Sequence, residues 1–134
     1  VMNIVYTKSV SAIDKEPKDG FKEIENKKIF FDFKSAGISA ESSKSLSEIA
    51  KLMNDYQEVK VEIQGHTDNQ EQAISELSSL GQDRAKNVFY YLTSKGIDEK
   101  RISYKGLGSS IPMSKDASAA GKAKNRRVEF VIME

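Results

Sequence analysis

The sequence predicts an α+β domain in which helices pack on one face of a sheet. The chain has 134 residues, which suits one domain, and its 38% apolar and 31% charged residues are typical of a well-solvated globular protein. From residue 28 onward, strand-like segments alternate with segments whose apolar residues follow helical spacing. Helices of about 15 residues between strands imply crossover connections, with the helices packed on the sheet.

The first 27 residues are predicted to form an N-terminal extension or linker, and the domain itself is predicted to span residues 28–134. Residues 1–6 alternate weakly in a strand-like manner. Residues 14–20 contain Pro17 and Gly20 among charged residues, a composition typical of a turn or linker.

The first strand is predicted over Lys28–Phe33, where aromatic and branched residues follow one another. Ser39 is a suitable N-cap for the helix that follows, and Glu41 is favourable in the first turn of that helix. Four apolar residues then define one helical face, namely Leu46, Ile49, Ala50 and Met53.

A half-buried strand is predicted over Val59–Thr67, because its apolar and polar residues alternate. A second helix follows, with an apolar face predicted to pack on Val61 and Ile63 and a stop at Gly96. The residues of that face are Ala85, Val88, Phe89 and Leu92. The remaining predicted elements are a strand over 101–107, a loop over 108–112, a short helix over 117–124 and a last strand over 126–133.

Composition excludes several classes of function. The net charge of +1 argues against a uniformly basic nucleic-acid-binding protein. The absence of cysteine excludes disulfides, thiolate catalysis and cysteine-ligated metals. No stretch approaches the roughly 20 apolar residues of a membrane span, and no signal peptide is evident. We therefore expect a soluble piece of a longer protein, with any membrane anchor outside this chain.

Polar side chains cluster at predicted strand ends and helix starts, where open α/β sheets often bind ligands. His66 is the only histidine, and it lacks partners for a catalytic triad or a zinc site. A structural role at the strand end is therefore favoured over a role as general base. The basic pair Arg126–Arg127, after Asn125, is too short for a nucleic-acid patch and is more typical of a solvated strand end.

Asp68 and Arg84 form the most informative pair. The planar guanidinium of arginine binds a carboxylate through two hydrogen bonds, and an aspartate accepts hydrogen bonds from an ammonium group. Together they would suit a zwitterionic amino-acid end group. Spacing alone nevertheless favours a surface salt bridge between them, worth less than about 1 kcal/mol.

Four separated motifs resemble the OmpA-like C-terminal peptidoglycan-binding domain. They are GHTDN at 65–69, LGQDRAKNVFYYL at 80–92, GIDEKRISYKGLGSSIP at 96–112 and NRRVE at 125–129. The segment FFDF at 30–33 resembles the first strand of that family. The resemblance covers about residues 28–133, and its order and spacing are specific.

The resemblance implies a βαβαβ two-layer sandwich with a mixed sheet that binds the diaminopimelate residue of the peptidoglycan peptide stem. It implies that Arg84 holds a stem carboxylate and that Asp68 accepts from the ammonium group of the same residue. It places the other ligand-binding residues around them, namely Asp32, Thr67, Asn125, Arg126 and Arg127. It further implies a non-enzymatic tether without metal or cofactor, in the periplasm, with the parent protein attached to the outer membrane. On this basis Arg84→Ala is expected to weaken binding while leaving stability nearly intact.

The sequence departs from the family pattern between Asn69 and Gly81, in the loop expected to bind ligand. The segment from Asp68 to Arg84 is one residue longer than usual, Gly81 replaces a serine, and Leu77 replaces an asparagine. A degenerate domain used for protein–protein interaction is therefore the alternative function. A wall hydrolase is a weaker alternative, because no nucleophile–base arrangement is evident.

Overall fold

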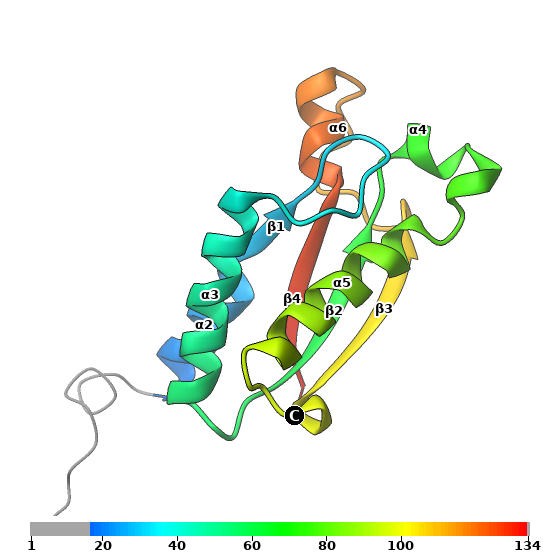
Figure 1. Cartoon of the computed structure of the whole chain (residues 1–134). Coiled ribbons are helices and arrows are strands. Elements are labelled where there is room, and N and C mark those ends of the chain that lie inside the picture. The colour runs from blue at the N-terminus through cyan, green and yellow to red at the C-terminus, as the bar shows by residue number, and fades with distance from the viewer. Residues whose placement is uncertain (1–16, 134) are drawn as a thin grey trace, which may run out of the picture.

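Four strands form one mixed sheet in the order β1-β4-β2-β3 (Figure 1). A computed structural model describes residues 17–133 of the chain. The strands are β1 (Lys28–Phe30), β2 (Lys60–His66), β3 (Ile102–Gly108) and β4 (Arg127–Met133). Strands β2 and β3 are parallel, whereas β4 runs antiparallel to both β1 and β2. The predicted fold class, an α+β domain with a mixed sheet, is confirmed.

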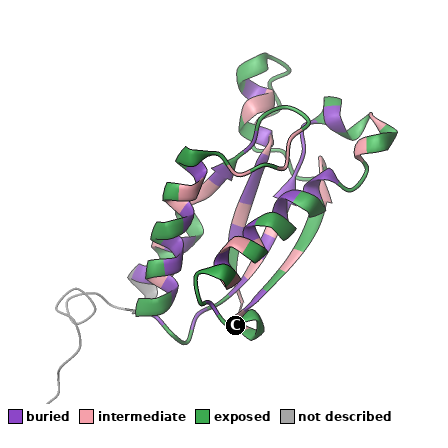
Figure 2. Cartoon of the chain, in the orientation of Figure 1, coloured by how far each residue is buried: buried purple, intermediate pink, exposed green. Residues whose placement is uncertain are grey.

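Two long helices, α3 (Ala40–Asp55) and α5 (Leu80–Ser94), lie side by side over one face of the sheet (Figure 1). Ser39 caps α3 as predicted, because its hydroxyl oxygen accepts a hydrogen bond from the Ser42 amide at 3.1 Å. The predicted apolar faces are buried between these helices and the sheet (Figure 2), with Phe89 half-buried. The buried members are Leu46, Ile49, Ala50, Met53, Val61, Ile63, Ala85, Val88 and Leu92.

Short helices and 3-10 turns lie in the segments that connect the strands and the two long helices. The helix α6 (Ala119–Asn125) confirms the predicted short helix and is capped by Ser118, which accepts from Gly121 N. The polar loop after β2 contains two elements that were not predicted, α4 (Asn69–Gln72) and a 3-10 turn, η1 (Ser75–Leu77). A second 3-10 turn, η2 (Glu99–Arg101), precedes β3.

The predicted linker over 14–20 is wrong from residue 17 onward, because Pro17–Asn26 forms a helix, α2. Proline fits the first turn of a helix, where its missing amide hydrogen is not needed. The helix contributes Ile24, which is 0% exposed, to the core, and the ring of Phe21 contacts the ring of Tyr56 edge-on at 6.2 Å. The strand-like alternation over 1–6 lies outside the described residues, and the domain boundary at residue 28 stays a prediction.

The first strand is shorter than predicted. It pairs with β4 only over Lys28–Phe30, although the amide of Phe31 still donates to the carbonyl of Arg126 at 3.0 Å. Residues 31–39 then leave the sheet and form a loop over its end. This departure frees residues 31–39 from strand pairing and places their loop beside α4 and α6 (Figure 1).

The start of α5 presses closely on the sheet at a contact between two glycines. A methyl group at Gly65 would overlap the carbonyl oxygen of Gly81, and one at Gly81 would lie 2.8 Å from the carbonyl oxygen of Gly65. Both obstacles are backbone atoms, so neither can move aside without shifting the helix or the strand. Glycine at positions 65 and 81 therefore allows α5 to approach β2 this closely.

Candidate functional site

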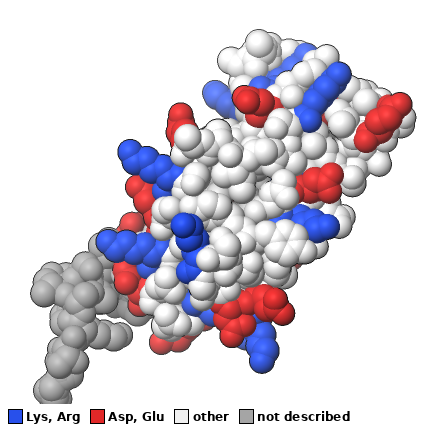
Figure 3. Space-filling view, in the orientation of Figure 1, with Lys and Arg blue, Asp and Glu red and all other residues white. Residues whose placement is uncertain are grey.

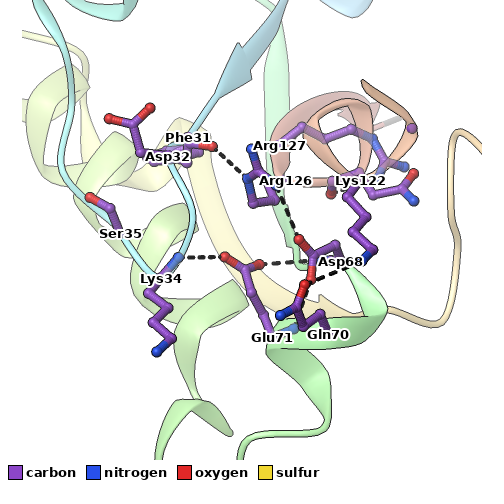
Figure 4. A network of polar contacts seen from close by, with 12 residues as sticks. Phe31, Asp32, Lys34, Ser35, Asp68, Gln70, Glu71, Lys122, Arg126 and Arg127 are labelled. Atoms are coloured by element: carbon purple, nitrogen blue, oxygen red, sulfur yellow. Dashed lines mark hydrogen bonds and ion pairs between the residues drawn. The ribbon is translucent and has the colours of Figure 1, made fainter. Parts of the chain in front are cut away.

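The candidate site lies where β2 ends and β4 begins, at the end of the sheet covered by the 31–39 loop, α4 and α6 (Figures 1 and 4). Lysine and arginine are interspersed with aspartate and glutamate over the face shown in Figure 3. Within residues 17–133, no group of three or more potential ligands is arranged to hold a metal ion. Over the same residues, no helix is long and apolar enough to cross a membrane.

Arg84 is the buried centre of this site, with 0% of its side chain exposed. Its Nε donates to the carbonyl of Ser35 at 2.8 Å. Its Nη1 donates to the carbonyl of His66 at 3.0 Å and to Glu71 Oε1 at 2.8 Å. Its Nη2 donates to the carbonyl of Asp32 at 3.1 Å and to Glu71 Oε2 at 2.7 Å. A guanidinium has five N–H donors, so every donor of Arg84 is used within the protein.

Glu71 is the carboxylate partner of Arg84, and it is likewise 0% exposed. Besides the two bonds from Arg84, Oε2 accepts from the Lys34 amide at 2.7 Å and Oε1 accepts from the Asp68 amide at 3.2 Å. Lys34 adopts a φ of 62°, a left-handed conformation that is unusual for a residue other than glycine. The loop is thus held in a strained turn that directs an amide at the buried ion pair.

The predicted pair between Asp68 and Arg84 does not form. Asp68 instead caps α4, where Oδ1 accepts from the Glu71 amide at 2.7 Å, and its Oδ2 pairs with Arg126 Nη1 at 3.2 Å (Figure 4). Sequence reasoning missed Glu71 altogether. The spacing Asp68-x-x-Glu71 is that of a capping box, a signal that could have placed a helix start there and brought Glu71 into the site.

Arg126 differs from Arg84 in being partly open, with 17% of its side chain exposed. Its Nε donates to the carbonyl of Phe31 at 3.0 Å and its Nη1 to Asp68. It borders a cavity of about 380 Å³ between β1, the start of α3 and the end of α6. The lining residues are Lys28, Phe30, Phe31, Asp32, Ser39, Glu41, Ser42, Ser45, Ala123, Lys124 and Arg126.

Asp32 takes part in the site through two separate groups. Its backbone carbonyl accepts from Arg84, while its side chain is exposed and lines the cavity beside Arg126. The carboxylate points away from Glu71 (Figure 4). The structure therefore brings the carboxylate of Asp32 and the guanidinium of Arg126 to the wall of the same cavity.

The other three predicted site residues are engaged in local structure. Thr67 Oγ1 donates to Gln72 Oε1 at 3.2 Å. Asn125 holds the 108–118 connection through two bonds of 2.9 Å with the backbone of Ser114, and both Thr67 and Asn125 border a second cavity of about 250 Å³. Arg127 is buried and donates to Glu129 Oε2 at 2.6 Å and to the Ile111 carbonyl at 2.9 Å. These contacts connect the end of β2 to α4, and the 108–118 connection to α6 and β4.

His66 is buried at the end of β2, with 1% of the residue exposed. Neither ring nitrogen has a hydrogen-bond partner within the described part of the chain. Burial, together with the positive charge of Arg127, lowers the pKa of His66 from 6.5 to about 4, although the negative charge of Glu129 acts in the opposite direction. The imidazole is therefore neutral at pH 7, which agrees with the structural role predicted for it.

Comparisons with known proteins agree on one family. A family model described as "OmpA family" matches residues 30–126. The "Probable lipoprotein YiaD" of Escherichia coli is 33% identical over 104 residues, and the "Peptidoglycan-associated lipoprotein" of Buchnera aphidicola is 32% identical over 99 residues. These matches cover 78% and 74% of this chain but only 47% and 57% of the relatives, so the chain spans about half their length.

The fold is also shared with solved structures. The crystal structure of the peptidoglycan-associated lipoprotein from Burkholderia pseudomallei matches with a TM-score of 0.73 and 28% identity. That match covers 81% of this chain and 91% of the solved one. The likeness therefore extends over most of both chains.

Proposed function

The chain belongs to the OmpA family, and on that premise we propose that it binds peptidoglycan non-covalently and tethers an envelope protein to the cell wall. The observation that carries the proposal is the convergence of Asp32, Asp68, Arg84 and Arg126 at one end of the sheet. Relatives and structural neighbours whose names describe peptidoglycan association share this fold over most of the chain, which supports the same binding function here.

The proposed ligand is the diaminopimelate residue of the peptide stem, whose free end is zwitterionic. Asp68 and Arg84 are the binding pair expected from the family, with Asp32 and Arg126 beside them. Thr67, Asn125 and Arg127 complete the site by holding the loops around it. The function requires binding energy alone, so the tether is non-enzymatic and uses neither metal nor cofactor.

The proposed location is the periplasm, with the parent protein attached to the outer membrane through a region outside this chain. Two observations support it: the matched relatives include lipoproteins and a protein named "Outer membrane protein A" from Bordetella avium. Many tethers acting on one polymeric wall would add avidity to a modest single-site affinity.

The direct test is co-sedimentation of the purified chain with isolated sacculi that contain diaminopimelate. The tether requires saturable binding that a chelator does not change, and prolonged incubation must release no soluble wall fragments. Zinc-dependent binding would contradict a metal-free tether. Release of muropeptides would instead identify a wall hydrolase.

The second candidate function is a degenerate domain that binds protein instead of wall. The observation that favours it is the Glu71–Arg84 pair, because the arginine expected to hold the ligand has no free donor. This candidate requires that the chain fails to sediment with sacculi while remaining folded. Saturable sacculus binding would exclude it as the sole function.

A further inference from the structure

Strand β3 presents an unpaired edge of the sheet. It lies at the end of the strand order, beside β2, and no strand among residues 17–133 pairs with its outer side (Figure 1). Backbone amides and carbonyls on the outer side of an edge strand can pair with a further strand. The strand at the opposite edge, β1, has only three residues, whereas β3 has seven. The edge of β3 is therefore the place where this sheet can be extended.

The side chains of β3 restrict which strand can pair with it. Lys105 is the only charged residue of β3, and it is exposed. It forms an ion pair with Glu62 of its own sheet at 3.4 Å. A lysine on an edge strand opposes unspecific pairing, because like charges that lie directly opposite each other destabilise a ladder. A partner strand must therefore place no positive charge opposite Lys105.

Aromatic side chains accompany this edge on the helical face of the sheet. Helix α5 packs on both β2 and β3, and the ring of Phe89 lies 5.1 Å from the ring of Tyr104. The ring of Tyr90 contacts Phe89 edge-on at 5.5 Å and is 54% exposed. Helical spacing places Lys86 and Thr93 on the same side of α5 as Phe89. Aromatic side chains are enriched in protein interfaces, so this side of α5 is suited to a partner.

Pairing of β3 with the same strand of a second copy has one favourable register. Tyr104 faces the helices, whereas Ser103 and Lys105 face the other side of the sheet. An antiparallel two-fold pair that keeps both helical layers on one side places residues of like face opposite each other. An axis at Lys105 would place two lysines opposite each other, and an axis at Ser103 would bring Lys105 opposite Arg101. An axis at Tyr104 instead places Lys105 opposite Ser103 and joins two tyrosines, a stabilising cross-strand pair.

We propose that two copies of this chain pair through β3 about an axis at Tyr104, so that one sheet continues through both copies. Neighbouring strands lie about 4.8 Å apart, and α5 lies over β2 and β3. The two copies of α5 are then roughly 10 Å apart, close to the usual distance of about 8–10 Å between packed helices. Lys86 of one copy lies near Thr93 of the other, so no like charges meet there. The dimer adds a second domain to the proposed tether and thereby avidity.

Introduced cysteines test the register, because the chain contains no cysteine of its own. Residues directly opposite each other in antiparallel strands have Cα atoms about 4.5–5.5 Å apart, which permits a disulfide. Ser103→Cys mixed with Lys105→Cys should form a mixed disulfide on mild oxidation, whereas neither variant alone should cross-link. Tyr104→Cys alone should cross-link to itself. Non-reducing gel electrophoresis and mass spectrometry identify the products, and efficient self-cross-linking of Ser103→Cys or Lys105→Cys would refute the Tyr104 axis.

Charge substitutions at Ser103 test the same register without a covalent bond. Ser103→Glu faces Lys105 of the other copy at two symmetric positions and should tighten association at least about threefold, whereas Ser103→Lys should weaken it by a similar factor. Within one chain Ser103 lies beside Glu62, so the same substitutions should change the melting temperature in the opposite direction. Lys51→Gln and Asp55→Asn on α3 are controls of equal charge change and should leave association unaltered.

Sedimentation velocity over a range of concentrations measures the association. A parent chain that stays monomeric at about 1 mM would overturn the proposal and leave the edge of β3 to a strand of another protein. A dimer that both Ser103→Glu and Ser103→Lys weaken would refute the Tyr104 axis, and a dimer that neither changes would place the interface elsewhere. None of these measurements uses peptidoglycan, so their outcome is independent of the proposed tether.

Discussion

Replacing Arg84 with alanine is expected to destabilise the fold strongly. The substitution leaves the carboxylate of Glu71 buried with two amide donors and no cation, and it removes donors from three backbone carbonyls. Breaking a buried ion pair by removing one partner costs about 3–5 kcal/mol. For a domain of this size, that loss lowers the melting temperature by roughly 10–20 °C. This outcome would contradict the expectation, drawn from the family resemblance, that Arg84→Ala spares stability.

The assay is urea unfolding of Arg84→Ala beside Lys27→Ala. Lys27 is the matched control because its pair with Glu48, at 2.8 Å, has side chains 33% and 55% exposed, and such pairs contribute less than about 1 kcal/mol. A double-mutant cycle with Glu71→Gln isolates the coupling between the buried partners, expected to exceed about 2 kcal/mol. If Arg84→Ala costs no more than Lys27→Ala, or if the cycle shows no coupling, the buried Arg84–Glu71 pair does not stabilise the fold.

Three further predictions concern pH, packing and the N-terminal helix. Because the folded-state pKa of His66 is about 4 and its ordinary value is 6.5, the unfolded state binds more protons between these values. Stability should therefore fall by on the order of 2 kcal/mol as pH drops from 6.5 to 4, and urea unfolding of His66→Phe should show a smaller fall over that window. Gly81→Ala should cost about 1–3 kcal/mol of unfolding free energy through overpacking, whereas Gly37→Ala, in an exposed loop, should be nearly neutral. Ile24→Ala should cost about 2–4 kcal/mol in the same assay, and a neutral result would restore the linker interpretation of α2.

The regular elements were predictable because their apolar residues repeat with the period of the element. Helix α5 and strand β2 each bury residues on one side. The spacing of apolar residues in the sequence therefore matches the period of each element. Helix α2 was not predicted, because Pro17 and Gly20 among charged residues are typical of a linker. Gly20 is instead needed where the ring of Tyr56 lies against the helix, a tertiary contact that no local pattern reveals.

Most members of the candidate site were predictable, but Glu71 and the pairing of the charged residues were not. The motifs located Asp68, Arg84 and Arg126, yet spacing cannot decide which carboxylate meets which guanidinium once loops converge from distant parts of the chain. Glu71 settles the pairing, since its capping-box position on α4 turns its carboxylate toward Arg84. Asp68 is then left to pair with Arg126.

Variants of Arg84 and Asp32 should both weaken sacculus binding, but only variants of the buried Arg84 should also lower stability. A binding assay alone would not distinguish these two effects. Loss of Arg84 releases the carbonyls of Asp32 and Ser35, so the loop that carries the Asp32 carboxylate loses its support and binding falls together with stability. The Asp32 carboxylate is exposed and faces the cavity, so Asp32→Asn is expected to weaken sacculus binding while leaving the melting temperature unchanged. A lysine at position 84 keeps a cation beside Glu71 but cannot reach all five acceptors, so it should recover part of the stability and part of the binding in proportion. If Arg84→Lys restores full stability yet binds no better than Arg84→Ala, Arg84 contacts the ligand directly and Glu71 must move aside when peptidoglycan binds.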